Sequence, residues 1–131
     1  MTRRVYLDSS ALVKLVVREP ESAALRAFIR RRKARASCAL ARVEVVRAVR
    51  NQGRAAVDRA HEVVERTELV RIDDQLLDTA AVLPGENLRG LDAIHLAAAQ
   101  RLGSDLTMLV SYDDRMLAAA RGLRIPVASP R

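Results

Sequence analysis

Short apolar runs alternate with longer stretches of helical spacing along this chain. Five of the short runs have the length and composition of buried strands. They cover residues 3–7, 36–40, 69–72, 107–112 and 126–129. The intervals between them show the apolar spacing of amphipathic helices. The expected helices cover residues 9–18, 21–33, 41–52, 54–66, 74–83, 91–103 and 113–122. This alternation predicts an α/β fold, a central parallel β-sheet flanked by helices on both faces.

Proline and glycine mark the ends of several expected helices, as these residues commonly do. They are Pro20, Gly53, Pro84-Gly85 and Gly103. The chain contains no low-complexity stretch, no linker and no repeat of fixed period. Its 131 residues are close to the commonest domain size. We therefore expect a single domain over residues 1–131.

The charge of the chain is unbalanced towards the basic side. Lysine and arginine outnumber aspartate and glutamate by 23 to 16, a formal net charge of +7. Basic residues crowd into residues 25–35 and recur at Arg42, Arg47, Arg50, Arg54 and Arg59. Any single arginine can belong to a solvated helix face, but the whole excess favours nucleic acid as a partner. Aromatic residues are too few for base-stacking platforms, so we expect contact with the phosphate backbone.

Four acidic residues stand where expected strands end or where the following helices begin. They are Asp8, Glu44, Asp92 and Asp113. In open parallel sheets, ligands bind beyond the carboxyl ends of the strands. Each acid alone could be a helix cap or a first-turn residue. Together, on so basic a chain, they predict a divalent-metal site that faces a negatively charged substrate.

The donor chemistry of this predicted site favours a hard cation. Mg²⁺ and Mn²⁺ prefer oxygen ligands, and a bound ion can activate water and stabilise charge on phosphate oxygens. Asp114 competes with Asp113 for the fourth position. The hydroxyls of Ser10 and Ser111 could orient a carboxylate or a metal-bound water. They could equally cap a helix (Ser10) and satisfy a strand end (Ser111).

Other residues of reactive type have structural interpretations. Asp73-Asp74 is expected to cap the helix over 74–83, and His61 to lie on a solvated face. Cys38 is expected to be a small buried residue. His95, one helical turn after an acid, could bind a metal but is interpreted as structural or as a support behind the ligands.

Nothing in the sequence indicates a membrane or an export route. No apolar run approaches the roughly 18–20 residues that a membrane span requires. The amino-terminal residues lack the apolar core of a secretory signal, and one cysteine excludes an internal disulfide. We expect a cytoplasmic protein without membrane contact.

Four segments follow one another in an informative order. VYLDSSALVKLVVREPES carries Asp8, and ARVEVVRAVR carries Glu44. RGLDAIHLAAAQRLG carries Asp92, and LVSYDDRMLAAARGLRIPVASP carries Asp113 with Ser111 two residues before it. In this order, and over nearly the whole chain, these segments resemble the PIN-domain nucleases and, within them, the VapC-type toxins of bacterial toxin–antitoxin pairs.

The resemblance implies a PIN-like fold and a metal-dependent endoribonuclease that hydrolyses RNA with a metal-activated water. It implies that Asp8 and Asp92 bind Mg²⁺ or Mn²⁺, and that Glu44 and Asp113 complete the site directly or through water. The Ser-x-Asp spacing of the family selects Asp113 over Asp114.

The resemblance also implies a homodimeric toxin that a VapB-type antitoxin silences in a toxin–antitoxin hetero-oligomer. A second hypothesis is a non-catalytic RNA- or partner-binding module on the same fold. Loss of an acid would indicate such a module, and all four acids are present. Catalysis is therefore the favoured interpretation.

Overall fold

The computed structural model describes residues 3–32 and 34–131, and within them the chain forms a sheet of five parallel strands. The strands are β1 (Arg4–Leu7), β2 (Arg35–Cys38), β3 (Glu68–Val70), β4 (Leu106–Val110) and β5 (Val127–Ala128). Each expected strand forms, with its ends displaced by one or two residues. The predicted α/β fold is confirmed.

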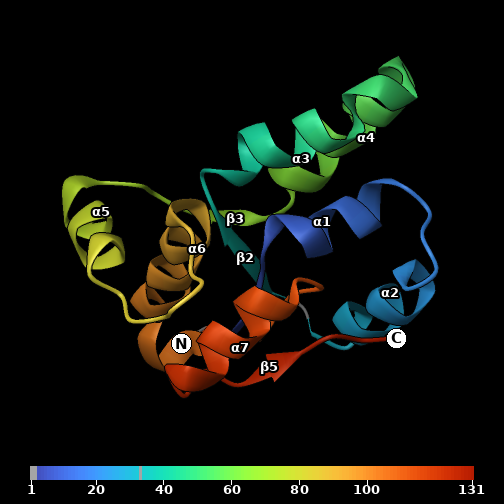
Figure 1. Cartoon of the computed structure of the whole chain (residues 1–131). Helices are drawn as coiled ribbons and strands as arrows, with labels where there is room; N and C mark the ends of the chain where they lie inside the picture. Colours follow the sequence, from blue (N-terminus) through green and yellow to red (C-terminus); the bar gives the residue numbers. More distant parts are fainter. Residues whose placement is uncertain (1–2, 33) are drawn as a thin grey trace.

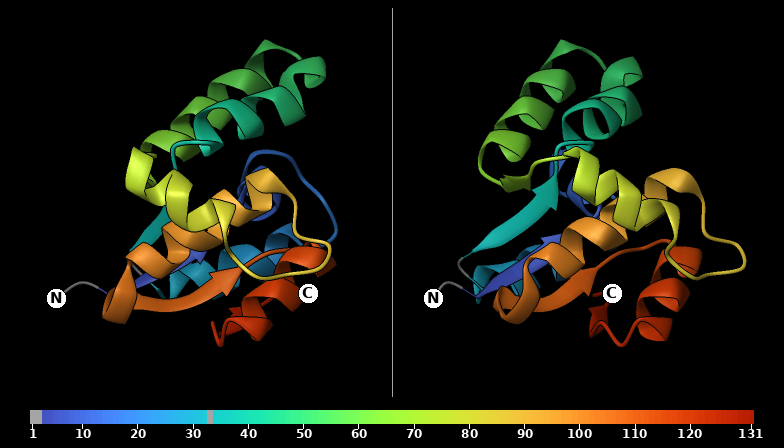
Figure 2. Two further views of the ribbon diagram at one scale, coloured as in Figure 1. Left: turned by 60° about the vertical axis from the view of Figure 1, so that its left-hand side comes forward. Right: turned by 90° about the vertical axis from the view of Figure 1, so that its left-hand side faces the viewer.

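Helices connect these strands in the expected order (Figure 1). They are α1 (Ser9–Val16), α2 (Ser22–Arg30), α3 (Ala41–Val49), α4 (Arg54–Glu65), α5 (Asp74–Ala81), α6 (Gly90–Arg101) and α7 (Asp114–Gly122). Figure 2 shows α3 and α4 side by side, as a pair that extends away from the sheet. Gly53 directly precedes α4 in the connection between the two helices. Its φ of +100 is a backbone conformation that other residues rarely adopt. Among the described residues, none of the helices has the length and apolar character needed to cross a membrane.

Two apolar cores cover the two faces of the sheet. One is built with α1 to α4, and the other with α5 to α7. Successive residues of β1 point alternately to each core: Val5 and Leu7 join the first, and Tyr6 joins the second. Because β1 is buried on both faces and lies at the centre of the sheet, its end is a rigid position for a functional residue.

We refer to the carboxyl ends of β1 and β4, where the strand order changes direction, as the crevice. The sheet order is β3-β2-β1-β4-β5, so the chain builds outward from β1 on one side and then crosses to the other. The last residues of β1 and β4, Leu7 and Val110, lie side by side. Ligands of parallel sheets bind at such a switch of direction, beyond the carboxyl ends of the two strands. Asp8 directly follows β1, and Ser111 directly follows β4.

Candidate active site

Asp8 lies at the crevice and also begins α1. Its Oδ1 atom accepts a hydrogen bond from the Ala11 N–H (3.1 Å), so the side chain caps the helix. Ser10 donates to the same oxygen (2.6 Å), and Ser111 donates to Oδ2 (2.5 Å). The capping interpretation of Asp8 is confirmed, and its place at the candidate site stays a prediction. Both serines orient its carboxylate, and Ser10 does not cap α1.

The Asp8 carboxylate is almost completely buried, at 3% exposure. Burial raises the pKa of Asp8, and the hydrogen bonds from Ser10 and Ser111 oppose this rise without cancelling it. A charge withdrawn from water is costly unless a partner compensates it. A cation bound to this carboxylate would provide that compensation.

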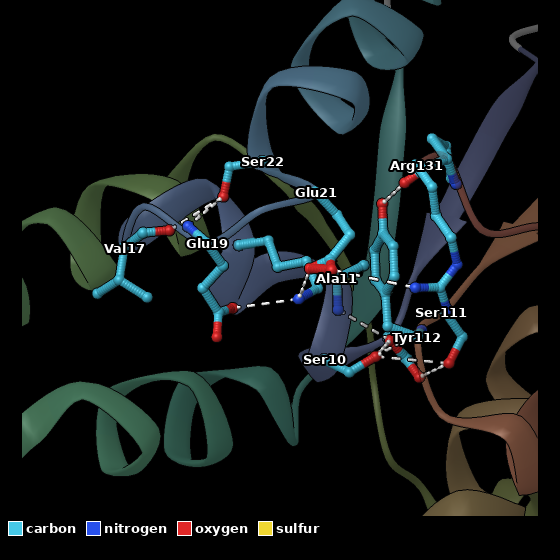
Figure 3. A network of polar contacts seen from close by, with 12 residues as sticks. Ser10, Ala11, Val17, Glu19, Glu21, Ser22, Ser111, Tyr112 and Arg131 are labelled. Carbon is cyan, nitrogen blue, oxygen red and sulfur yellow. Dashed lines mark hydrogen bonds and ion pairs between the residues drawn. The ribbon is translucent and has the colours of Figure 1, made fainter.

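The two serines also tie together the ends of β1 and β4 (Figure 3). The Tyr112 N–H donates to Ser10 Oγ, and the Asp113 N–H donates to Ser111 Oγ, both at 3.0 Å. The Tyr112 hydroxyl donates to the Pro130 carbonyl (2.8 Å) and so holds the carboxyl-terminal segment. The backbone that leads from β4 to α7 is thus fixed against α1.

Glu44 comes from the first turn of α3 and is held by two side chains. Ser9 donates to its Oε1 atom (2.7 Å), and His95 Nε2 lies 2.8 Å from the same oxygen. Burial alone would raise the pKa of Glu44, but the hydrogen bonds with His95 and Ser9 outweigh burial and lower it. Glu44 is therefore kept ionised and oriented.

His95 lies behind Glu44, in agreement with its interpretation from the sequence as a supporting residue. It is 2% exposed, and its Nδ1 atom lies 2.7 Å from the Tyr6 hydroxyl and 3.6 Å from Cys38 Sγ. Burial alone would lower the pKa of His95, but hydrogen bonds with Cys38 and Glu44 raise it to about 10. His95 thus links Glu44 to the core. The helical spacing between Asp92 and His95 indicated that the two side chains share a face of α6, but it could not predict the contact with Glu44.

Asp92 lies half-buried in the first turn of α6. Burial raises the pKa of Asp92, and repulsion from Asp113 raises it further, while Arg115 opposes both. Glu44 adds a smaller repulsion. Asp92 and Glu44 line a common pocket of about 630 Å³, in which Arg115 is also a lining residue. The tertiary structure therefore brings these acids close enough to repel one another.

Asp113 follows β4 and caps α7. Its Oδ1 atom accepts hydrogen bonds from the N–H groups of Arg115 (2.9 Å) and Met116 (3.4 Å). Asp114 is the first residue of α7 and is exposed. It is the charge of Asp113 that raises the pKa of Asp92, and this electrostatic contact favours Asp113 as the fourth acid.

The other structural interpretations hold as well. Asp73 caps α5 by accepting from the Leu76 N–H (2.9 Å). His61 is exposed, and Cys38 is a buried free thiol.

The donor set suits a hydrated hard cation. Within residues 3–32 and 34–131, no three His, Cys, Asp or Glu side chains are grouped so that they could hold a metal ion by themselves. Mg²⁺, however, usually keeps several waters and takes only one or two carboxylates directly. Carboxylates that repel one another and share a pocket fit this mode of binding. The assignment of Asp8, Glu44, Asp92 and Asp113 to the site stays a prediction.

This fold and crevice, with acids at strand ends, define a class of protein. The family described as PIN domain matches residues 5–122, and the chain belongs to this family. It is similar to three proteins of Mycobacterium tuberculosis. Ribonuclease VapC46 is 52% identical over 126 residues, 96% of this chain and 97% of the relative. Ribonuclease VapC35 is 42% identical over 130 residues, and Ribonuclease VapC47 is 34% identical over 131 residues; both alignments cover 96% of each chain.

A solved structure has the same fold, in agreement with membership of the PIN-domain family. The crystal structure of Mycobacterium tuberculosis VapC20, described as a Sarcin-Ricin loop cleaving toxin, superposes with a TM-score of 0.72. It covers 88% of this chain and 94% of that chain, at 14% sequence identity. Such a distant likeness supports the fold. The predicted resemblance to VapC-type PIN domains is confirmed.

Proposed function

We propose that this chain is a metal-dependent endoribonuclease and the toxin of a VapBC-type toxin–antitoxin pair. The names of its relatives support the ribonuclease activity. The observation that supports the metal dependence is that Asp113, and to a smaller extent Glu44, repel the Asp92 carboxylate, while Asp8 directly follows β1. Such repulsion is relieved when a divalent cation binds among the carboxylates.

The residues of the crevice divide into two roles. Asp8 and Asp92 would hold Mg²⁺ or Mn²⁺ directly, and Glu44 and Asp113 would complete the site directly or through water. When bound, the ion lowers the pKa of a water molecule and stabilises charge on phosphate oxygens. Arg115, which lines the same pocket, offers a guanidinium to the substrate phosphate.

The remaining side chains hold the carboxylates in place. Ser10 and Ser111 fix both oxygens of Asp8, while Ser9 and His95 fix Glu44. In the proposed hydrolysis, an activated water attacks phosphorus and the P–O3′ bond breaks, which leaves 3′-hydroxyl and 5′-phosphate ends. No cyclic phosphate forms, because the 2′-hydroxyl takes no part.

The partners in this proposal are RNA and protein. We propose that the chain forms a homodimer in the cytoplasm and that a VapB-type antitoxin silences it in a hetero-oligomer. Sequence similarity to the ribonucleases VapC46 and VapC35 over nearly the full length of the chain supports the proposal of these partners.

Cleavage of mixed cellular RNA tests the proposal. The wild type is assayed in Mg²⁺, in Mn²⁺ and in EDTA, beside Asp92→Asn and the matched control Asp114→Asn, which removes a charge from an exposed position one residue after Asp113. We expect discrete cuts from the wild type and from Asp114→Asn, and a loss of at least about a hundredfold with Asp92→Asn or EDTA.

Three results would contradict the proposal. Cleavage that survives in Asp92→Asn would place the activity elsewhere. Cyclic-phosphate ends would exclude attack by water. A folded, antitoxin-free wild type that binds RNA without cutting it would indicate a non-catalytic binding module.

A further inference from the structure

A second charged site lies away from the acids. Five arginines and one apolar residue line a hollow of about 450 Å³. They are Arg26, Ile29, Arg30, Arg32, Arg35 and Arg66. They come from α2, from the first residue of β2 and from the residue after α4, so only the tertiary structure assembles them. We refer to the five arginines as the arginine cluster.

The charges of the arginine cluster are not neutralised within the described part of the chain. None of its members forms an ion pair with a carboxylate there, whereas Arg4, Lys14 and Arg101 all do. Glu68, two residues after Arg66, pairs with Arg4 (2.5 Å) instead. The cluster is a group of like charges that needs an external anion.

Neutral acceptors hold two of these guanidinium groups in place. Arg26 donates to the Leu15 carbonyl (2.8 Å), and Arg32 donates to the Phe28 carbonyl (2.9 Å). The Arg32 guanidinium also stacks on the Phe28 ring, 3.7 Å from its centroid. These contacts hold the two guanidinium groups in place without neutralising their positive charge, so the charge remains available to an anion. Burial, together with repulsion from Arg66 and Arg26, lowers the pKa of Arg35, as expected of crowded cations.

The arginine cluster and the acids lie at opposite ends of the sheet. Arg35 begins β2 and is paired with Val5 near the start of β1, while Asp8 follows the end of β1. A strand of four residues rises about 13 Å. A phosphate in the hollow is therefore separated from a bond that is cut at Asp8 by about the length of β1.

We propose that the arginine cluster is a second RNA-binding site, which holds the phosphate backbone at a distance from the cut. Guanidinium groups bind phosphate with paired hydrogen bonds, and a concave group of them suits a polyanion. Backbone contacts carry no base information, so the cluster adds affinity and leaves the choice of cut to the crevice. This inference rests on the proposed ribonuclease function.

Equilibrium binding of a fluorescent single-stranded RNA of mixed sequence, in EDTA to prevent cleavage, tests the cluster. The double variant Arg30→Gln with Arg66→Gln removes two exposed side chains that make no ion pair in residues 3–32 and 34–131, so the fold is retained. The matched control is Arg54→Gln with Arg121→Gln, the same change of charge at exposed positions on α4 and α7. Thermal unfolding of each variant verifies folding.

We expect the cluster variant to bind RNA at least about tenfold more weakly at about 0.1 M salt, with a salt slope reduced by about 1.4 for two lost phosphate contacts. The control pair should bind within about twofold of the wild type. Equal weakening in both pairs would overturn the inference, because net charge would then be the cause. Unchanged RNA binding with lost binding of a polyglutamate peptide would also overturn it, in favour of an acidic protein partner.

The same variants separate this inference from the proposed function. If the wild type cuts no RNA but the cluster variant binds RNA more weakly, the arginine cluster stands and the ribonuclease proposal fails. If the wild type cuts RNA and the cluster variant binds it normally, the ribonuclease proposal stands and the arginine cluster fails.

Discussion

At the scale of single residues, Asp8 performs two tasks with one carboxylate. It caps α1, and it presents a charge at the crevice between β1 and β4. The two tasks are compatible because a carboxylate has four lone-pair positions and the cap uses one of them. Ser10 and Ser111 take others, and they arrive from two segments about a hundred residues apart. The second hydroxyl is available only because β4 lies beside β1.

Ser111 should therefore be required for full activity. Ser111→Ala removes the hydroxyl that donates to Asp8 Oδ2 and accepts from the Asp113 N–H. A lost hydrogen bond to a charged group costs about 1.5–3 kcal/mol, so kcat/KM for RNA should fall about tenfold or more. Steady-state cleavage of a defined RNA measures the change.

Two further variants make this prediction specific. Ser111→Thr keeps the hydroxyl and should retain most of the activity. Ser129→Ala removes a buried hydroxyl without a hydrogen-bond partner in the described structure, so it should leave kcat/KM unchanged. If Ser111→Ala cleaved as fast as the wild type, the carboxylate of Asp8 would need no such support.

At the scale of elements, three helices are capped by an aspartate, but only two of these aspartates lie at the predicted site. Asp8, Asp73 and Asp113 each cap the helix that follows a strand. Asp73 follows β3, which is the edge strand of the sheet, two strands away from β1. It pairs with Arg101 of α6 (2.8 Å) instead of facing the crevice. Strand order separates a structural cap from a site residue of identical type.

Asp73, which caps α5, should contribute to the free energy of unfolding in a pH-dependent way. Arg101, with the Leu76 N–H, lowers the pKa of Asp73 from 3.8 to about 2. A carboxylate with a lowered pKa in the folded state stabilises the protein above its unfolded pKa, and this contribution is lost as the pH falls from about 3.8 through about 2. Asp73→Ala should lower the urea midpoint at neutral pH, and the difference from the wild type should shrink towards pH 2.

Urea unfolding at several pH values tests this behaviour. Asp73→Asn keeps a helix cap and loses the ion pair, so its midpoint should lie between those of the wild type and Asp73→Ala. Asp78→Ala, at an exposed position on the same helix, is the control. A difference between Asp73→Ala and the wild type that is constant from neutral pH to pH 2 would mean that the charge of Asp73 does not matter.

At the scale of the whole molecule, charge is divided between two regions. The chain carries a net charge of +7. Asp92 is repelled by Asp113 and Glu44 near the carboxyl ends of the strands, whereas the arginine cluster, without ion pairs among residues 3–32 and 34–131, lies near the amino ends of β2 and β3. The acidic region suits a divalent cation, and the arginine cluster suits phosphates. In both proposals, binding of the ligand would relieve electrostatic repulsion between like charges.

A divalent cation should therefore stabilise the folded protein. At a hundred times its Kd, one bound ion contributes about 2.7 kcal/mol to the free energy of unfolding. Mg²⁺ or Mn²⁺ should raise the Tm of the wild type, and EDTA should reverse the change. Asp92→Asn should lose most of this shift, whereas Asp114→Asn should keep it. Equal shifts in both variants would mean that the ion binds elsewhere.

The sequence by itself determined the elements and the chemistry of the candidate site. Helical and strand periodicities are local, so the alternation of strands and helices could be predicted to within one or two residues at each strand end. The acids Asp8, Glu44, Asp92 and Asp113 could be selected because each stands at the end of a strand or the start of a helix. The resemblance of four segments to PIN domains identified the family from the sequence alone.

Only the tertiary structure decided which of these residues meet. Periodicity carries no information on strand order, and the placement of β4 beside β1 is what brings Ser111 to Asp8. In the same way, the packing of α6 against the sheet brings His95 to Glu44. The end of α4 brings Arg66 to the arginines of α2 and β2. These contacts join residues far apart in the chain, so they depend on the packing of the whole domain.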